Sequence, residues 1–305
     1  MTLRFGVAGT GYWAETVHLT ALATHPAVKL VGVWGRSAEK VEALATKFGI
    51  APFRRFDEML AQTDAISIAL PPQIQADLAL AAAEAGKHLL LEKPLSMTPA
   101  SARAIAESIE RRGLASIVFF MRRFIPDVET AIQLARNEPW TEGNVQVHSG
   151  ALLGDSPYAR SVWRQADAGA LWDIGPHVLS ILMPVLGNVE NVRATMGADR
   201  YVRFSTRHAS GATAAVSLTL HADPGAVISR YVFRGPQREL TLPEPSFSRP
   251  ALLAQAVGDL VDAIRTGKTA HRCDVRLGAQ VVDALAAAAR SIETGTSVAV
   301  AATRA

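Results

Sequence analysis

Residues 3–14 of the chain have the sequence LRFGVAGTGYWA. The apolar segment Leu3–Ala8 is typical of a buried strand, a turn with two glycines follows it, and the pattern over Ala14–Thr24 is typical of a helix. A strand that passes through a glycine-rich turn into a helix is the opening unit of a doubly wound parallel sheet. This stretch therefore predicts an α/β fold, with strands and helices alternating along the chain that follows.

The predicted alternation continues to residue 121. Six apolar segments are expected to form strands: Leu3–Ala8, Val28–Trp34, Pro52–Phe56, Ala65–Leu70, His88–Glu92 and Ala115–Met121. The helical patterns between them are Ala14–Thr24, Ala38–Phe48, Ile74–Ala85 and a segment from Thr98 to Gly113. Continuous apolar strands belong to a parallel sheet that helices cover on both faces. Residues 1–121 are thus predicted to form a Rossmann-type domain with a doubly wound parallel sheet.

Residues 122–305 are predicted to form a second domain. Five segments in this part have the pattern of strands: Asn144–Leu152, Val189–Thr195, Tyr201–Thr206, Ala212–His221 and Ser229–Arg234. The length of 305 residues, of which 49% are hydrophobic, is sufficient for two domains that each bury a core. This composition excludes a disordered chain, which would be poor in apolar residues.

The charge pattern argues against nucleic acid as a partner. The 31 basic and 28 acidic residues leave a net charge of +3, and the basic residues are scattered along the chain. No stretch contains the dense positive charge on which bulk binding to phosphate backbones depends.

Other features bear on the cellular setting. Cys273 is the only cysteine, so no internal disulfide can form, and it has no neighbours at the spacing of a structural zinc site. The sequence begins without a signal-peptide pattern and has no uninterrupted apolar stretch of the length that a membrane span requires. We therefore expect a soluble, cytoplasmic protein without a metal or a membrane partner.

The glycine-rich turn over residues 9–14 matches the pattern G-x-G-x-x-G/A. Gly9 would permit the tight turn, Gly11 would let the backbone approach a pyrophosphate, and Ala14 would keep the helix close to the strand. A turn with only a structural role is the alternative. The position between a strand and a helix N-terminus favours dinucleotide binding, with contacts from Gly9, Thr10, Gly11, Tyr12 and Trp13.

The end of the second predicted strand bears on the choice of cofactor. An NAD site usually has an Asp or Glu there for the ribose 2′-hydroxyl, whereas this chain has Gly35, Arg36 and Ser37. The missing carboxylate would not repel a 2′-phosphate, and the guanidinium of Arg36 can bind one through its planar fork. Alternatively, Arg36 stacks on the adenine of either cofactor. We expect NADP to be preferred over NAD.

Two places are candidates for the chemistry. Lys93 follows the fifth predicted strand, and ligands of open α/β sheets bind beyond the carboxyl ends of strands. Asp173 and His177 lie four residues apart and would share one face of a helix, an arrangement that suits a general base. The alternatives are a solvated lysine, a structural histidine, and a helix broken at the intervening Gly175 and Pro176.

Taken together, these motifs resemble those of the glucose–fructose oxidoreductase, inositol dehydrogenase and rhizopine-catabolism (Gfo/Idh/MocA) family. The resemblance covers nearly the whole chain. Its motifs are Gly9–Ala14, Leu70-Pro71-Pro72, Ala85–His88, Glu92-Lys93-Pro94, Trp163-Arg164, Gly169–His177, a helix over Leu252–Arg265, and a long helix that opens at Asp274-Val275-Arg276 and ends at Gly295.

The resemblance implies a two-domain NAD(P)-dependent oxidoreductase. Its second domain would be of the α+β type, with a large, open and mostly antiparallel sheet that covers the nicotinamide and forms a homodimer or homotetramer. Lys93 would bind the oxygen of a small polar substrate, His177 would act as general base, and Asp173 would orient the site. Hydride would pass between a carbinol carbon and nicotinamide C4. Further cofactor contacts are implied for Arg36, Ser37, Pro71, Glu92, Lys93, Trp163 and Arg164.

Several positions depart from the family pattern. Ser180 stands where many members have an acid, Gln75 where a histidine often occurs, and Ala168 where the motif has a glycine. Such positions tend to line or support the substrate pocket, so the substrate stays open among sugars, cyclitols and related molecules. Arg122 and Arg123 would favour an acidic substrate if they lie near the pocket, and would otherwise be a surface pair.

Two other functions are compatible with this fold. A non-catalytic dinucleotide-binding regulator would need neither Lys93 nor His177, and both are present. A glycosidase that oxidises its substrate transiently would keep NAD tightly bound, and Arg36 argues against it because that role normally uses NAD.

Overall fold

The computed structural model describes residues 2–301 and divides into two compact units. The first unit comprises Met1–Phe124 and Phe247–Ala279, and the second comprises Ile125–Ser246 and Gln280–Ala305. The first crossing between the units thus lies close to the predicted boundary at residue 121. The assignment of all of residues 122–305 to the second domain needs a correction, because residues 247–279 return to the first unit.

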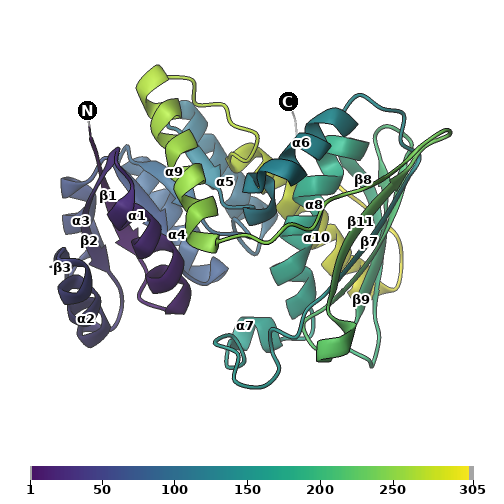
Figure 1. Cartoon of the computed structure of the whole chain (residues 1–305), viewed down its shortest axis with the longest axis horizontal. Coiled ribbons are helices and arrows are strands. Elements are labelled where there is room, and N and C mark those ends of the chain that lie inside the picture. Colours follow the sequence, from purple (N-terminus) through teal and green to yellow (C-terminus); the bar gives the residue numbers. More distant parts are fainter. Residues whose placement is uncertain (1, 302–305) are drawn as a thin grey trace. The chain divides into compact units, whose positions relative to one another are not determined.

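The first unit contains a six-stranded parallel sheet with the strand order β3-β2-β1-β4-β5-β6. Figure 1 labels three of these strands, β1, β2 and β3. The strands are β1 Leu3–Ala8, β2 Val28–Trp34, β3 Ala51–Phe53, β4 Ala65–Ile68, β5 His88–Leu91 and β6 Ser116–Val118. The predicted doubly wound sheet is therefore confirmed. The strand order changes direction between β1 and β4, which is where ligands of such sheets bind.

Helices accompany this sheet: η1 Ala14–Leu19, α1 Thr20–Thr24, α2 Ala38–Phe48, α3 Phe56–Gln62, α4 Pro72–Glu84, α5 Pro99–Arg111, the short turn η2 Met121–Phe124, and α9 Arg249–Thr266. The sequence did not predict α3, and it extended the preceding strand to Phe56. That side chain instead packs on Trp34, with ring centroids 5.2 Å apart. Asp57 and Glu58 then lie in the first turn of α3, where carboxylates stabilise a helix N-terminus.

The helix α9 explains the corrected boundary. It packs against η1, α1 and η2 and against the strands β5 and β6. Its apolar face, which includes Leu253, Val257 and Leu260, is fully buried. Burial of this face gives residues 247–279 their place in the first unit, although about 120 residues of the second unit separate them from β6.

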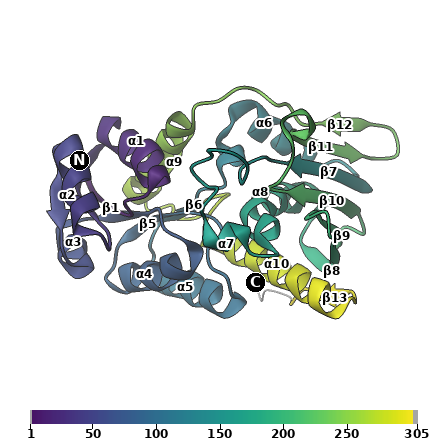
Figure 2. The ribbon, with the colours of Figure 1, turned by 90° about the horizontal axis from the view of Figure 1, so that it is seen from below.

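The second unit contains a seven-stranded sheet with the order β12-β11-β7-β10-β9-β8-β13, most of which Figure 2 shows side by side. The strands are β7 Glu142–His148, β8 Val189–Met196, β9 Val202–His208, β10 Thr213–Thr219, β11 Ile228–Arg234, β12 Glu239–Thr241 and β13 Val298–Ala299. Among the described strand pairs of this second sheet, only the β7–β10 pair is parallel. The predicted mostly antiparallel sheet is confirmed. Along β9, exposed and buried residues alternate, so one face of the sheet is polar.

The second unit also contains the helices α6 Pro126–Ala135, α7 Val162–Gln165, α8 Gly169–Leu186 and the 3₁₀ turn η3 Pro224–Ala226, and most of α10 Val275–Thr294. Of these, α8 packs on β7, β9 and β10. It continues through Gly175 and Pro176, which the sequence marked as a possible break. A Cβ atom at Gly175 would lie 2.7 Å from Leu285 Cδ2 of α10, so the glycine permits two helices to pack closely.

Among the described residues, α8 is long and apolar enough to cross a membrane, and 83% of it is buried inside the protein. A core helix meets the same criteria of length and composition. Its burial against the sheet also compensates for the backbone hydrogen bond that Pro176 cannot donate.

Candidate active site

The glycine-rich turn leads directly from β1 into a helical segment. Gly9 has φ +141°, and a Cβ atom there would lie 2.5 Å from the carbonyl oxygen of Ala69, so the protein itself requires this glycine. Gly11 differs, because a Cβ atom there would meet nothing within 4 Å. The space beside Gly11 is what close approach of a pyrophosphate needs, so the turn fits a dinucleotide. Ala14 is fully buried, as expected for a helix that lies close to its strand.

The turn, Pro71 and Lys93 follow neighbouring strands at one edge of the sheet. In the register of these strands, Ala8 pairs with Ile68, and Ile68 pairs with Leu91. Because the strands are parallel, the segments that follow them begin at the same edge. The predicted cofactor contacts Gly9–Trp13 and Pro71 therefore gather near Lys93, which is half-buried.

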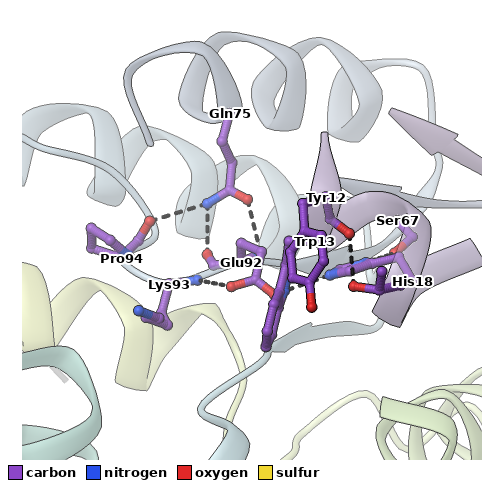
Figure 3. Close-up of polar contacts among 9 residues, drawn as sticks. Tyr12, Trp13, His18, Ser67, Gln75, Glu92, Lys93 and Pro94 are labelled. Atoms are coloured by element: carbon purple, nitrogen blue, oxygen red, sulfur yellow. Dashed lines mark hydrogen bonds and ion pairs between the residues drawn. The ribbon is translucent and has the colours of Figure 1, made fainter. Parts of the chain in front are cut away.

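The carboxylate of Glu92 is the centre of a polar network, which Figure 3 shows. Its Oε1 atom accepts a hydrogen bond from Trp13 Nε1 at 2.7 Å and lies 3.0 Å from His18 Nε2. The other ring nitrogen of His18, Nδ1, lies 2.7 Å from Ser67 Oγ. The main-chain N–H of Lys93 donates to Glu92 Oε2 at 3.3 Å. The carboxylate therefore connects the glycine-rich turn to the residue that the sequence selected for catalysis.

Sequence reasoning missed His18 and Ser67, although both are fully buried. His18 lies in η1, a π-helical segment, and helices of this kind are frequent at functional sites. A signal was present in the sequence, because Ser67 interrupts an apolar strand and His18 lies on the apolar face of a helix. Buried polar groups need partners, so two such residues predict a contact.

Gln75 departs from the family pattern, and its side chain is fully buried. It contacts the main chain on both sides of Lys93 (Figure 3). Gln75 therefore supports the loop that carries Lys93. Of the two roles expected at this position, support of the substrate pocket fits the structure, and lining of the pocket does not.

The residues that follow β2 are the ones that the sequence analysis connects with the choice of cofactor. A Cβ atom at Gly35 would lie 2.6 Å from Thr10 Cγ2, so this glycine lets β2 pass close to the glycine-rich turn. Arg36 is exposed, which leaves its guanidinium accessible to a ligand. The hydroxyl of Ser37 accepts a hydrogen bond from Lys40 N at 3.4 Å and so caps α2.

The second unit carries the other predicted residues. Asp173 and His177 lie one turn apart on the continuous helix α8, as predicted. Arg164 Nε lies 3.0 Å from Asp173 Oδ2, and its guanidinium stacks on the rings of Trp163 and Tyr158. Ser180 donates to the main-chain oxygen of His177 at 2.8 Å. The structure thus brings together Trp163, Arg164 and Asp173 within the second unit, whereas Lys93 belongs to the first unit.

The pair Arg122 and Arg123 does not present two exposed cations. Arg123 is 2% exposed, and its carbonyl oxygen accepts a hydrogen bond from Arg272 Nη2 at 3.4 Å. This burial favours a structural role for Arg123 over recognition of an acidic substrate.

Comparisons with known proteins agree with the geometry. Residues 3–120 match the model of an oxidoreductase family described as having an NAD-binding Rossmann fold. The chain is 30% identical over 245 residues to dTDP-3,4-didehydro-2,6-dideoxy-alpha-D-glucose 3-reductase of Streptomyces violaceoruber, a match that covers 78% of this chain and 68% of the relative. It is 29% identical over 225 residues to D-xylose 1-dehydrogenase (NADP(+)) 2 of Haloferax volcanii, covering 70% and 68%.

A solved structure with the same fold is that of a levoglucosan dehydrogenase in complex with NADH and levoglucosan. It superposes with a TM-score of 0.87 at 19% identity, and the match covers 99% of this chain and 100% of the other. The sequence-based fold assignment and the family resemblance are confirmed. The chain belongs to the Gfo/Idh/MocA oxidoreductase family and is an NAD(P)-dependent oxidoreductase that transfers a hydride to or from a small polar substrate.

Proposed function

We propose that this enzyme prefers NADP(H) and interconverts a secondary hydroxyl and a carbonyl on a sugar or a related polyol. The observation that carries the proposal is the edge of the first sheet, where the open space at Gly11 and the half-buried Lys93 follow neighbouring strands. The two relatives named above are a sugar reductase and a sugar dehydrogenase, which supports this substrate class.

In the proposed mechanism, the glycine-rich turn Gly9–Trp13 and Pro71 would hold the nicotinamide cofactor, which would supply the hydride acceptor or donor when bound. The Lys93 ammonium donates a hydrogen bond to the substrate oxygen and stabilises the negative charge that develops there during oxidation. His177 removes the hydroxyl proton in that direction and returns it in reduction. Asp173, which the ion pair with Arg164 holds in place, orients the substrate or the imidazole.

The preference for NADP(H) is supported by the end of β2. The residues that directly follow this strand, Gly35, Arg36 and Ser37, include no carboxylate, and Arg36 is exposed. A 2′-phosphate would form charge-assisted hydrogen bonds with this guanidinium. NADPH and NADH are titrated separately against the purified protein, with tryptophan fluorescence as the signal and Arg36→Ala as the test variant.

NADPH is expected to bind at least about tenfold more tightly than NADH, since one such hydrogen bond contributes about 1.5–3 kcal/mol. Arg36→Ala should remove this difference and leave NADH binding unchanged. Equal or tighter binding of NADH to the unmodified protein would contradict the proposal.

We further propose that the protein forms a homodimer or homotetramer through the open sheet of the second unit. A shallow hollow of about 410 Å³ lies on this sheet, lined by polar residues that include Asn144, Gln146, Arg193 and Ser205. A polar face of this kind can pair with its own copy through hydrogen bonds. Light scattering tests the proposal, and a monomeric mass at micromolar concentration would exclude it.

A further inference from the structure

The loop that carries Lys93 lies beyond the end of the sheet ladder. The strand β5 ends at Leu91, and α5 begins at Pro99. Residues 92–95 therefore depend on other contacts to hold the main chain in one place. The side chain of Gln75, from the first turn of α4, supplies several of them (Figure 3).

The amide of Gln75 binds Glu92 in the way that a neighbouring strand would. Its Oε1 atom accepts from Glu92 N at 2.8 Å, and its Nε2 atom donates to Glu92 O at 2.6 Å. The same Nε2 atom donates to Pro94 O at 3.1 Å and lies 3.4 Å from Leu95 O. A carboxamide has two N–H donors, which the two shorter contacts use. Gln75 therefore fixes the main chain immediately before and after Lys93.

Gln75 is itself held rigidly. Its main-chain N–H donates to Pro71 O at 2.9 Å in the first turn of α4, and its side chain is fully buried. The other buried residues of α4 are Pro72 in its first turn and the alanines Ala76, Ala79, Ala82 and Ala83. Small side chains let the helix lie close to the sheet, so a glutamine is long enough to reach the loop.

We propose that Gln75 is a positioning residue that sets the place of Lys93 by holding the main chain on both sides of it. This inference deepens the proposed function and rests on the assigned role of Lys93. In these contacts, the side chain of Gln75 binds main-chain atoms of the loop and no other group. It therefore acts through Lys93 and not on the substrate. Displacement of a positioned group by about 1 Å can lower a rate about a hundredfold.

The test compares Gln75→Leu with Gln73→Leu, because Gln73 is exposed on the same helix and serves as the matched control. Turnover is measured with the fastest sugar or polyol in a panel of D-glucose, D-xylose, methyl D-glucoside and myo-inositol. Gln75→Leu should lower kcat about ten- to a hundredfold while NADPH affinity stays within about twofold. Gln73→Leu should change neither quantity. Unchanged kcat in a folded Gln75→Leu protein would overturn the proposal.

Two readouts do not depend on the substrate. The first is amide hydrogen exchange at Glu92, which should become at least about tenfold faster in Gln75→Leu because its acceptor is lost. The second is the rate at which acetic anhydride labels Lys93 as a function of pH, read by peptide mass spectrometry. The labelling profile should change in Gln75→Leu and not in Gln73→Leu. Two unchanged readouts would show that Gln75 does not position Lys93.

Two more variants separate the possible failures. Gln75→His keeps one donor and one acceptor and should restore part of the lost kcat, and it replaces Gln75→Leu if that protein does not fold. Lys93→Ala tests the proposed function by itself. If Lys93→Ala strongly lowers turnover, as expected, Gln75→Leu in its background should lower the remaining rate no further; an added loss would overturn positioning through Lys93. Full activity of Lys93→Ala would instead overturn the proposed role of Lys93.

Discussion

The loop around Lys93 and the helix that carries His177 place their functional side chains in different ways. The loop is held by side chains, since Gln75 binds its main chain and Trp13 and His18 bind Glu92. The helix α8 is held by its own backbone and by apolar burial against the second sheet. A loop held by a few polar contacts is sensitive to single polar substitutions, whereas a buried helix is sensitive to changes in packing.

The largest expected effects on turnover come from removal of the Lys93 ammonium and of the His177 imidazole. Lys93→Ala and His177→Ala should each lower turnover about 10²–10⁴-fold, the usual contribution of an acid–base group. His177→Ala should bind NADPH as the unmodified enzyme does, as measured by fluorescence titration, and Lys93→Ala should retain NADPH binding that the same titration can detect. Unchanged turnover in either variant would remove that residue from the mechanism.

The glycine-rich turn permits a sharper test within the first unit. Gly9→Ala should destabilise the protein by about 1–3 kcal/mol, because the φ of +141° and the contact with Ala69 O both oppose a side chain. Gly11→Ala should leave the melting temperature nearly unchanged and weaken NADPH binding at least about tenfold, because its methyl group would occupy the space for the pyrophosphate.

Thermal unfolding and NADPH titration of both variants give the answer. Tight NADPH binding by Gly11→Ala would mean that the cofactor does not approach the turn. An unchanged melting temperature in Gly9→Ala would mean that the turn can relax around a side chain.

Smaller effects should separate the polar loop from the apolar helix. His18→Ala removes a buried donor to Glu92 and should cost about 1–3 kcal/mol of unfolding free energy, with a loss of turnover from the displaced loop. Ser180→Ala removes a hydroxyl that donates within α8 itself, and it should cost less than about 1 kcal/mol. Urea unfolding followed by circular dichroism compares the two variants, and similar losses would contradict the distinction.

The smallest effect concerns pH and one histidine in each unit. Burial lowers the pKa of His208, whose Nδ1 lies 2.7 Å from Gly187 O, and burial also lowers the pKa of His88, whose Nδ1 accepts from Ala115 N at 2.9 Å. Their ordinary pKa is about 6.5. At acid pH the folded state therefore binds fewer protons than the unfolded state. The free energy of unfolding is not reduced by these histidines above about pH 6.5, and it falls as the pH decreases below that value.

Unfolding by urea at several pH values between 5 and 8 measures this loss. His208→Asn and His88→Asn should each make the free energy of unfolding less dependent on pH in this range. An undiminished dependence in both variants would assign the acid sensitivity to other groups.

The sequence was sufficient to predict most of the fold, because continuous apolar strands and capped helices are local signals. The bounds of β1, β2 and α2 agree with prediction to the residue. The helix α3 was missed because its segment is short, and the tertiary contact between Phe56 and Trp34 decides its structure. The return of α9 to the first unit could not be predicted, since burial of its apolar face is decided between distant segments.

The candidate site was predicted in part. The residues at strand ends, such as Lys93, follow from the sheet topology, and the pairing of Asp173 with His177 follows from the helical spacing. The partners that hold them do not follow, because Gln75 meets Glu92 from 17 residues away and His18 meets it from 74 residues away. Such contacts depend on the three-dimensional packing of α4 and η1.

The return of α9 has a consequence for biosynthesis. A ribosome makes residues 1–124 long before it makes Arg249–Thr266, so the first unit must wait for about 120 intervening residues before its core can close. Until then, the surface that α9 will cover exposes apolar side chains to solvent. A fragment that ends at residue 124 should therefore aggregate when it is expressed alone, which light scattering of the purified fragment measures.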